Sequence, residues 1–475
     1  MLEAPPLAPA LLEELRGLLP GARSVLTSRE DLLVYGYDGT WYEGMPQVVV
    51  IPESTDQVAA VVLLANRELI PVTPRAMGSS LSGGPVPRRG GIVIDTKRMD
   101  RILEIDEVNF VAVVQPGVIN ADLQAAVERR GLFYPPDPSS LRQSAIGGNI
   151  AENAGGSRCL KYGVTSDYVM GLEVVLPTGE VIRTGGKMVK NVTGYNLRQL
   201  ITGAEGTLGV VTEATLRLIK KPPHARTAMF VFASIVDAAQ CVTAVMSAGL
   251  LPTAIEMMDD VTMACVEEMF AIGLPVEREA ILLISVDGHH AAVVDGELAA
   301  ITEIAAAAGA VEVRTAANQA EADALWQARR GISPALARKR PNKLGEDVSI
   351  PRSEIPHMVR AVREIARKYG LPIPIYGHVG DGNLHPNILC DRHDGAELER
   401  VGKAAREIFE AAVACGGTLS GEHGIGLLKK QFLELDLGSA QVEAMRRIKA
   451  ALDPNGIMNP GKIFPEPGGA DIFKL

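Results

Sequence analysis

The segment PRAMGSSLSGG (residues 74–84) follows a short apolar run and contains three glycines. Glycine lets successive backbone N–H groups turn toward one anion, and such a nest suits a pyrophosphate. Two further glycine clusters follow between predicted strands, at residues 146–156 and 203–209. Each cluster alone fits a plain turn equally well. Three clusters in one predicted domain favour a site for a large cofactor.

The runs around these clusters predict one α+β domain. From Pro46 to about Pro222, short β-branched stretches alternate with glycine turns. Neither GxGxxG nor GxxxxGK[ST] occurs, so the chain lacks the sequence motifs of the Rossmann and P-loop folds. A nucleotide would therefore need a different kind of binding site. We expect three regions: an N-terminal helical segment (1–45), a cofactor domain (46–222) and a substrate domain (223–475).

The region after Pro222 predicts a second sheet covered by helices. Apolar strands precede helical stretches near 236–249 and 291–308. Further helices are expected at 318–338, 353–369 and 396–415, with strands between them.

Composition excludes several classes of protein. The 475 residues suit two or three domains, and 47 basic against 57 acidic residues give a net charge of −10. This charge disfavours a broad grip on nucleic acid or anionic lipid. The five cysteines form no CxxC pair, and no apolar run has the length of a membrane span. We expect a cytoplasmic protein, or one held at the inner membrane through a partner.

Two histidines flank a tight turn in GHVGDGNLHPN (residues 377–387). If residues 380–383 form the loop, His378 pairs with His385 and both imidazoles emerge side by side on one face, in chelating geometry. The alternative is a pair of hydrogen-bonded histidines on a half-buried hairpin.

A third imidazole and a carboxylate lie between glycines, as Glu422 and His423 in SGEHGIG. Two neutral imidazoles and a carboxylate leave open positions on a divalent ion, as in catalytic metal sites.

A carboxylate substrate would need a cation, and the densest basic run of this acidic chain lies between 329 and 343. A solvated helix face is the usual explanation of such a run. Asn387 projects to the same strand face as His385 and could bind a substrate oxygen. Asn459 either returns the C-terminal segment to the cofactor or simply forms a turn before Pro460.

Seven motifs occur in a specific order over nearly the whole chain. They are PRAMGSSLSGG, PPDPSS, IGGNIAENAGG, KNVTGYNLRQLITGAEGTLGVVTEATL, GHVGDGNLHPN, SGEHGIG and MNPGKIF. On these motifs the chain resembles the FAD-linked oxidases of the vanillyl-alcohol oxidase type. Within them it resembles the D-2-hydroxy-acid dehydrogenase branch, which includes the glycolate oxidase flavin subunit, D-lactate dehydrogenase and D-2-hydroxyglutarate dehydrogenase. The resemblance implies an α+β fold: a PCMH-type FAD-binding domain, a ferredoxin-like substrate or cap domain, and a C-terminal helical segment that returns to the flavin.

The resemblance also implies which residues bind FAD. The family's loop commonly reads Gly-Ala-Gly-Thr-Gly, whereas this chain has Ala-Met-Gly-Ser-Ser at 76–80. All eight histidines lie at position 224 or later, so non-covalent FAD is expected, with Cys159 as a remote alternative for attachment. The implied residues are Arg75, Gly78, Ser79 and Ser80 at the pyrophosphate, and Asp137, Ser139, Gly148, Asn149, Gly155, Gly206 and Val211 along the rest of the nucleotide.

By the same resemblance, His378, His385 and Glu422 bind one divalent ion, Zn, Fe or Mn. His423 is then the general base, or alternatively a fourth ligand or an orienting residue. Arg329 corresponds to the family's carboxylate-binding arginine, and Ser333 and Lys343 are weaker candidates for substrate binding.

The expected reaction is oxidation of a small (R)-2-hydroxy acid to the 2-oxo acid, with hydride transfer to flavin N5. Electrons would pass to an electron-transfer flavoprotein, an iron–sulfur subunit, a quinone or oxygen. Three alternatives stay open: a non-catalytic electron-transfer subunit, an ether-lipid synthase that uses FAD without net oxidation, and a D-2-hydroxyglutarate-type dehydrogenase. The sequence leaves open the group at C2 of the substrate, the metal, the acceptor and the oligomeric state, including a homo-oligomer.

Overall fold

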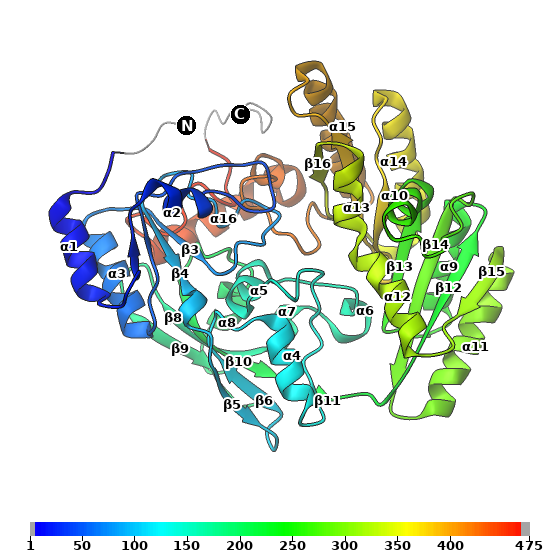
Figure 1. The fold of residues 1–475 in the computed structure, drawn as a ribbon, viewed down its shortest axis with the longest axis horizontal. Coiled ribbons are helices and arrows are strands. Elements are labelled where there is room, and N and C mark those ends of the chain that lie inside the picture. Colours follow the sequence, from blue (N-terminus) through cyan, green and yellow to red (C-terminus); the bar gives the residue numbers. More distant parts are fainter. Residues whose placement is uncertain (1–4, 467–475) are drawn as a thin grey trace. The chain divides into compact units, whose positions relative to one another are not determined.

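A computed structural model describes residues 5–466, which form two compact units (Figure 1). Unit 1 contains the described residues up to Gly155, then Val164–Lys221 and the stretch from Glu422 onward. Unit 2 contains Gly156–Gly163 and Pro222–Gly421. The outer ends of the predicted regions 1–45 and 223–475, residues 1–4 and 467–475, lie outside the described residues.

Unit 1 begins with a four-stranded sheet of order β1-β2-β4-β3. Strands β2, β4 and β3 run parallel. Helix α3 (Thr55–Arg67) starts where the hydroxyl of Ser54 accepts the N–H of Gln57, and it packs its valines against the strand valines and helix α1 (Pro9–Leu18) in one core. The strands are β1 (Val25–Leu26), β2 (Val48–Val50), β3 (Val72–Arg75) and β4 (Ile92–Asp95).

A second, five-stranded antiparallel sheet of unit 1 has the order β5-β6-β10-β8-β9. Its strands are β5 (Ile102–Asp106), β6 (Val111–Val114), β8 (Val169–Val175), β9 (Val181–Gly185) and β10 (Val210–Arg217), and β7 (Leu132–Phe133) pairs with β11 (Ile219–Lys220). The helices of unit 1 that follow α1 are α2 (Arg29–Val34), α3, α4 (Asn120–Glu128), α5 (Ile146–Glu152), α7 (Thr165–Tyr168), α8 (Leu197–Ile201) and α16 (Leu433–Leu452), with 3-10 turns at Thr96–Arg98 and Lys430–Phe432.

The C-terminal segment returns to the first sheet of unit 1. The N–H of Val72 donates to the carbonyl of Ile457 at 2.8 Å, and the N–H of Asn459 donates to the carbonyl of Val72 at 2.7 Å. Ile457 and Met458 join the core around α3. Residues nearly 400 positions apart in the sequence therefore complete one sheet edge.

Unit 2 is built on an antiparallel sheet of order β15-β12-β14-β13-β18-β19-β16, with β17 paired to β19. The strands are β12 (His224–Phe232), β13 (Ala254–Asp259), β14 (Ala280–Gly288), β15 (Ala310–Thr315), β16 (Asn342–Gly345), β17 (Val348–Ser349), β18 (Ile375–His378) and β19 (Asn383–Cys390).

Helices cover both faces of this sheet. Its central strands are therefore buried on both sides. Alternate strand residues such as Met229 and Val231 pack against α10, α12 and α13, and α9 and α11 contact the same strands (Figure 1). The helices are α6 (Cys159–Tyr162), α9 (Ile235–Ser247), α10 (Asp260–Phe270), α11 (Ala291–Ala307), α12 (Gln319–Arg330), α13 (Ile332–Lys339), α14 (Ile355–Tyr369) and α15 (Gly395–Ala414), with a 3-10 turn at Arg352–Glu354. The predicted α+β class is confirmed.

One predicted helix, 318–338, is wrong as a single element. The structure divides it at Gly331 into α12 and α13. A Cβ atom at Gly331 would lie 2.3 Å from the ring of Phe270. The ring of α10 therefore occupies the space that a side chain would need, and a second helix begins there.

Candidate functional site

The loop after β3 folds over a buried arginine. Arg75 is 9% exposed and its Nη1 donates to the carbonyl of Tyr37 at 2.9 Å. The guanidinium also lies 5.7 Å from the centre of the Tyr35 ring. Gly78 has φ +67°, and a Cβ there would lie 2.1 Å from the guanidinium. The positive φ favours glycine, and any side chain here would displace the guanidinium, while the neighbouring Ser79 is exposed.

Helix α5 carries an unsatisfied amide. Asn149 is 3% exposed, and its Nδ2 has no hydrogen-bond partner among residues 5–466. A buried donor without a partner costs about 1–3 kcal/mol, so this amide fits a polar group of a bound cofactor. A Cβ at Gly148 would meet only the Cβ of Ala76, at 3.8 Å. These residues fit the nucleotide expected from the sequence.

A buried carboxyl that the sequence interpretation missed ends this helix. Glu152 Oε1 accepts the hydroxyls of Ser80 at 2.7 Å and Ser82 at 3.1 Å. Burial and the nearby Glu205 raise the pKa of Glu152 well above its usual range. Ser80 therefore directs its hydroxyl to Glu152.

Asn459 links three segments of unit 1. Its Nδ2 donates to the carbonyls of Gly84 at 3.0 Å and Glu205 at 2.8 Å. Lys462, also missed, is buried and donates from Nζ to the carbonyls of Gly84 and Val86 at 3.0 and 2.5 Å. Burial lowers the pKa of Lys462 to about 7. The C-terminal segment is thus fixed to the glycine loop, so Asn459 does more than form a turn.

The SGEHGIG segment enters unit 1 at Glu422. Glu205 accepts the N–H groups of Ile425 and Gly426, both at 2.8 Å. Burial raises the pKa of Glu205 to about 7. Glu205 therefore holds the backbone directly after Glu422 and His423.

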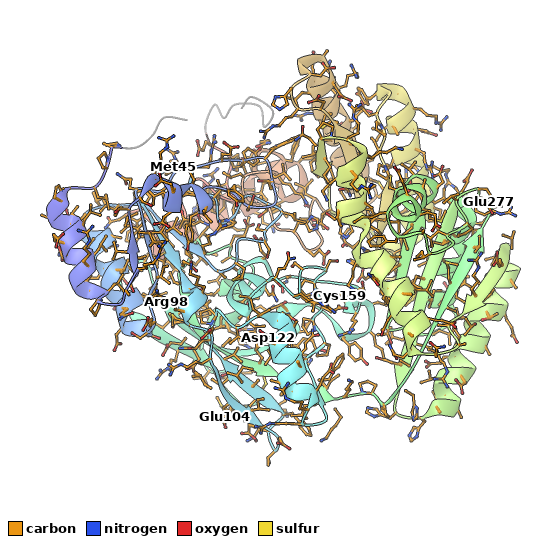
Figure 2. The ribbon with its side chains drawn as sticks, viewed as in Figure 1. Met45, Arg98, Glu104, Asp122, Cys159 and Glu277 are labelled. Atoms are coloured by element: carbon orange, nitrogen blue, oxygen red, sulfur yellow. The ribbon has the colours of Figure 1, made fainter. Side chains whose placement is uncertain are left out.

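The other predicted cofactor residues lie on separate elements of unit 1. Asp137 is half-buried and Ser139 is exposed in the segment after β7, while Gly155 is buried. Gly206 lies in the turn before β10, and Val211 is half-buried in β10. Cys159 begins α6 in unit 2 (Figure 2).

In unit 2, the predicted register of the histidine hairpin is wrong. His378 pairs with Asn383 instead of His385. The loop covers 379–382, because the carbonyl of His378 already accepts the N–H of Asp381 at 3.2 Å. The error is two residues, and strand side chains alternate with a period of two, so both imidazoles still share a face. Their ring centres are 5.2 Å apart with an interplanar angle of 89°.

His378 contacts a buried carboxylate on the neighbouring strand. Its Nδ1 lies 2.5 Å from Oε1 of Glu256, which is fully buried in β13. Arg329, in α12, donates from Nε to Oε2 of Glu256 at 2.5 Å and lies 5.1 Å from the centre of the Tyr376 ring. Burial alone would raise the pKa of Glu256, but Arg329 and His378 lower it overall. A neutral imidazole that donates from Nδ1 carries its lone pair on Nε2.

His385 lies beside a second buried carboxylate. Its Nδ1 is 3.6 Å from Oδ1 of Asp347, which is fully buried. Oδ2 of Asp347 accepts the hydroxyl of Ser420 at 2.7 Å, and its carbonyl accepts the N–H of Gly421 at 3.2 Å. Gly421 directly precedes Glu422 in the chain. Asp347 therefore fixes the backbone that leads into Glu422.

The three other substrate candidates are paired locally. Lys343, in β16, donates from Nζ to the hydroxyl of Ser333 in α13, and burial lowers the pKa of Lys343 to about 8. Asn387 is 2% exposed, and its Nδ2 donates to the carbonyl of His385 at 3.0 Å.

Glu256 and Asp347 were missed although the sequence contains a signal for Glu256. It interrupts the otherwise apolar run AIEMM (residues 254–258), and a charge in a buried strand needs a partner. Asp347 lies beside Glu346 in a polar stretch, where no such contrast exists. Lys462 has no distinguishing pattern either.

Among the helices that the structure describes, none has the length and apolar character needed to cross a membrane.

Two protein families match the sequence. Residues 46–185 match "FAD binding domain" and residues 221–463 match "FAD linked oxidases, C-terminal domain". The chain is 48% identical to the glycolate oxidase subunit GlcD of Bacillus subtilis (strain 168), over 91% of this chain and 92% of that protein. It is 36% identical to the D-2-hydroxyglutarate dehydrogenase of Stutzerimonas stutzeri (strain A1501), over 96% and 99%, and 35% identical to the D-lactate dehydrogenase of Anaerostipes hadrus, over 92% and 92%.

Solved structures resemble the fold. p-Cresol methylhydroxylase gives a TM-score of 0.79 with 21% identity and 96% coverage of both chains. Alkyldihydroxyacetonephosphate synthase gives 0.75 with 18% identity, over 97% of this chain and 87% of that chain. At these identities the similarity concerns the fold alone.

Proposed function

Because the chain belongs to the FAD-linked oxidases with a PCMH-type FAD-binding domain, we propose that it oxidises a small (R)-2-hydroxy acid to the 2-oxo acid. One observation carries the proposal. Two imidazoles share a face of one hairpin, Nδ1 of His378 contacts the buried carboxylate of Glu256 at 2.5 Å, and Nδ1 of His385 lies 3.6 Å from that of Asp347. Histidines that bind catalytic metals are commonly oriented by a carboxylate in this way.

We propose that His378, His385 and Glu422 bind one divalent ion, Zn, Fe or Mn. Two imidazoles and a carboxylate are typical of a metal site that keeps positions open for a substrate. The contact of Glu256 with Nδ1 of His378 supports Nε2 as the ligand atom. The bonds of Asp347 to Ser420 and Gly421 support Glu422 as the third ligand, because they fix the backbone that precedes it.

When bound, FAD supplies a hydride acceptor and the divalent ion supplies a Lewis acid. The proposed task of His423 is to accept the proton of the C2 hydroxyl. Arg329 uses Nε for Glu256, and its Nη2 lies 3.5 Å from Nδ1 of His378, so Nη1 is the proposed donor to the substrate carboxylate. Asn387, Ser333 and Lys343 are proposed to contact the remaining substrate oxygens.

We propose that region 46–222 binds FAD without a covalent bond and that region 223–475 binds the substrate. The unsatisfied amide of Asn149 supports the first assignment. The proposed FAD contacts are Arg75, Gly78, Ser79, Ser80, Asp137, Ser139, Gly148, Asn149, Gly155, Gly206, Val211 and Asn459.

Electrons must leave the reduced flavin, and we propose a partner protein as the acceptor, an electron-transfer flavoprotein or an iron–sulfur subunit. Two observations support it. The GlcD relatives are named subunits of glycolate oxidase, and the five cysteines of this chain have none of the paired spacing of a cluster site. If the acceptor protein is bound to a membrane, it would also hold this protein near that membrane.

The test is metal content and anaerobic flavin reduction of His385→Ala. We expect metal affinity to fall by more than about 100-fold, beyond the usual cost of losing only an orienting residue. FAD should no longer bleach with the active 2-hydroxy acid. His393→Ala, an exposed histidine just beyond the same strand, is the matched control and should keep both properties. Normal metal content and bleaching in His385→Ala would refute the metal site.

A panel of glycolate, D-lactate and D-2-hydroxyglutarate separates the candidate functions. The S. stutzeri relative, covered over 99% of its length, favours D-2-hydroxyglutarate as the second candidate substrate. Failure of all three to bleach FAD in the metal-loaded protein would support a non-catalytic flavin subunit.

A further inference from the structure

Strand β15 is an open edge of the sheet in unit 2. It pairs with β12 on one side, and no other strand among residues 5–466 pairs with its outer side (Figure 1). The ladder with β12 is regular from Glu312 to Thr315. An edge strand presents a row of backbone N–H and C=O groups that another strand can use.

The side chains of β15 do little to block such pairing. Val313, in the regular part of the ladder, is 36% exposed, and Val311, at the register irregularity before it, is 53% exposed. Glu312 and Arg314 occupy the face opposite Val313, and their side chains are 45% and 44% exposed. Within the strand, Nε of Arg314 donates to Oε1 of Glu312 and its Nη1 donates to the carbonyl of Gly273 at 2.7 Å. Edge strands are usually protected by lysine, proline, a very short length or a β-bulge, and the register irregularity of β15 lies only at its start, between Ala310 and Glu312. Here, exposed valines alternate with one negative and one positive charge.

We propose that β15 pairs antiparallel with β15 of a second copy of this chain, with Val313 on the twofold axis. This register places Glu312 opposite Arg314 of the second copy and Arg314 opposite Glu312 of the second copy. The two valines at position 313 then meet on the opposite face. Oppositely charged and β-branched cross-strand pairs both stabilise a sheet, and a twofold axis makes each contact occur in duplicate.

The charge pattern also specifies this register. A shift by two residues, which keeps the same faces together, places Glu312 opposite Glu312 or Arg314 opposite Arg314. In-register parallel pairing gives both of these like-charge contacts. Because like charges directly opposite each other destabilise a sheet, the antiparallel register centred on Val313 is favoured over its neighbours.

Light scattering coupled to size exclusion tests the proposal over a range of protein concentrations. The 50.5 kDa chain should approach twice its mass as concentration rises. Glu312→Arg and Arg314→Glu each place like charges opposite each other twice, so each should weaken self-association by on the order of tenfold. Glu443→Arg, in the exposed part of α16, is the control charge reversal and should associate as the unaltered protein does.

Mixing the two single variants gives the decisive result. The E312R chain then carries a positive charge at both positions and the R314E chain a negative charge at both, so every cross-strand pair between them joins opposite charges. The 1:1 mixture should therefore associate more tightly than either variant alone. The double variant E312R/R314E should regain self-association for the same reason. The proposal would be overturned by a monomeric wild-type protein, by undiminished association of both single variants, or by a mixture that stays monomeric. A monomeric wild-type protein would instead leave β15 as an edge for a strand from another protein.

Discussion

The carboxylate of Glu256 forms two buried contacts inside unit 2, an ion pair with Arg329 and a contact with the imidazole of His378. It lies between Arg329 and His378, and both Glu256 and Arg329 are almost fully buried. Removing one member of a buried ion pair leaves an uncompensated charge, which costs about 3–5 kcal/mol. We expect Glu256→Gln to lower the free energy of unfolding by about 3 kcal/mol, measured by urea denaturation of the FAD-loaded protein.

The matched control is the exposed pair of Glu443 with Arg447 in α16, whose side chains are 53% and 77% exposed. Glu443→Gln should change the free energy of unfolding by less than about 0.5 kcal/mol, because water screens such pairs. Equal effects of the two substitutions would contradict a special role for Glu256.

Lys462 predicts a pH dependence of stability. Its pKa is lowered to about 7 in the folded protein, whereas an unfolded lysine titrates near about 10.4. Between these values the unfolded chain binds a proton that the folded protein lacks, so the free energy of unfolding rises with pH by at most about 1.4 kcal/mol per unit. Compared with Lys462→Met, the wild-type protein should gain stability from about pH 7.5 to about pH 9.5. Parallel stability curves would exclude the depressed pKa.

The junction between α12 and α13 depends on one glycine. A Cβ at Gly331 would lie 2.3 Å from the Phe270 ring, so Gly331→Ala should lower the free energy of unfolding by about 1–3 kcal/mol through overpacking. Phe270→Leu in the same chain should recover part of that loss. Gly296→Ala, within α11 and with nothing within 4 Å of the added atom, should be neutral or stabilising by up to about 1 kcal/mol. Equal losses at both glycines would refute the ring contact.

The helix break and the hairpin illustrate which features the sequence could predict. The expected helices 236–249, 291–308, 353–369 and 396–415 agree with α9, α11, α14 and α15 to within two residues, because each is a local stretch of helix-forming sequence. At the break, Gly331 packs against a ring some sixty positions away, a contact that local patterns do not contain. The histidine register was wrong by an even number, so the shared face was still correct.

The site was predictable only where its residues lie in short motifs. The imidazoles and Glu422 are marked by glycines and turns, whereas Asp347 lies in no such motif and acts through contacts with a distant loop. Glu205 lies in a glycine motif, but its bonds to Ile425 and Gly426 are not visible there. Such contacts follow from the folded topology. The loop glycine Gly78 could be expected from its motif, but the arginine that fills its space could not.

The two units are interleaved along the chain, which crosses between them after Gly155, Gly163, Lys221 and Gly421. Neither unit is therefore one continuous stretch. The 422–466 segment belongs to unit 1, although its residues 422–463 match the C-terminal family. A boundary at Lys221 separates the two family matches along the sequence. It does not separate the two folded units, because unit 1 also contains the segment from Glu422 onward.

This interleaving predicts that residues 1–221 do not fold alone. The fragment lacks Ile457 and Met458, whose burial in the core around α3 contributes about 3–6 kcal/mol, an amount comparable with the whole stability of a domain. It also lacks Asn459 and Lys462, so the carbonyls of Gly84 and Val86 lose their donors. We expect no cooperative unfolding and no FAD binding in fluorescence titrations of 1–221. Joining 422–475 to it through a flexible linker of about 20 residues should restore both, because unit 1 then has all its segments. Equal FAD affinity of the two fragments would mean that the C-terminal return is dispensable for the cofactor site.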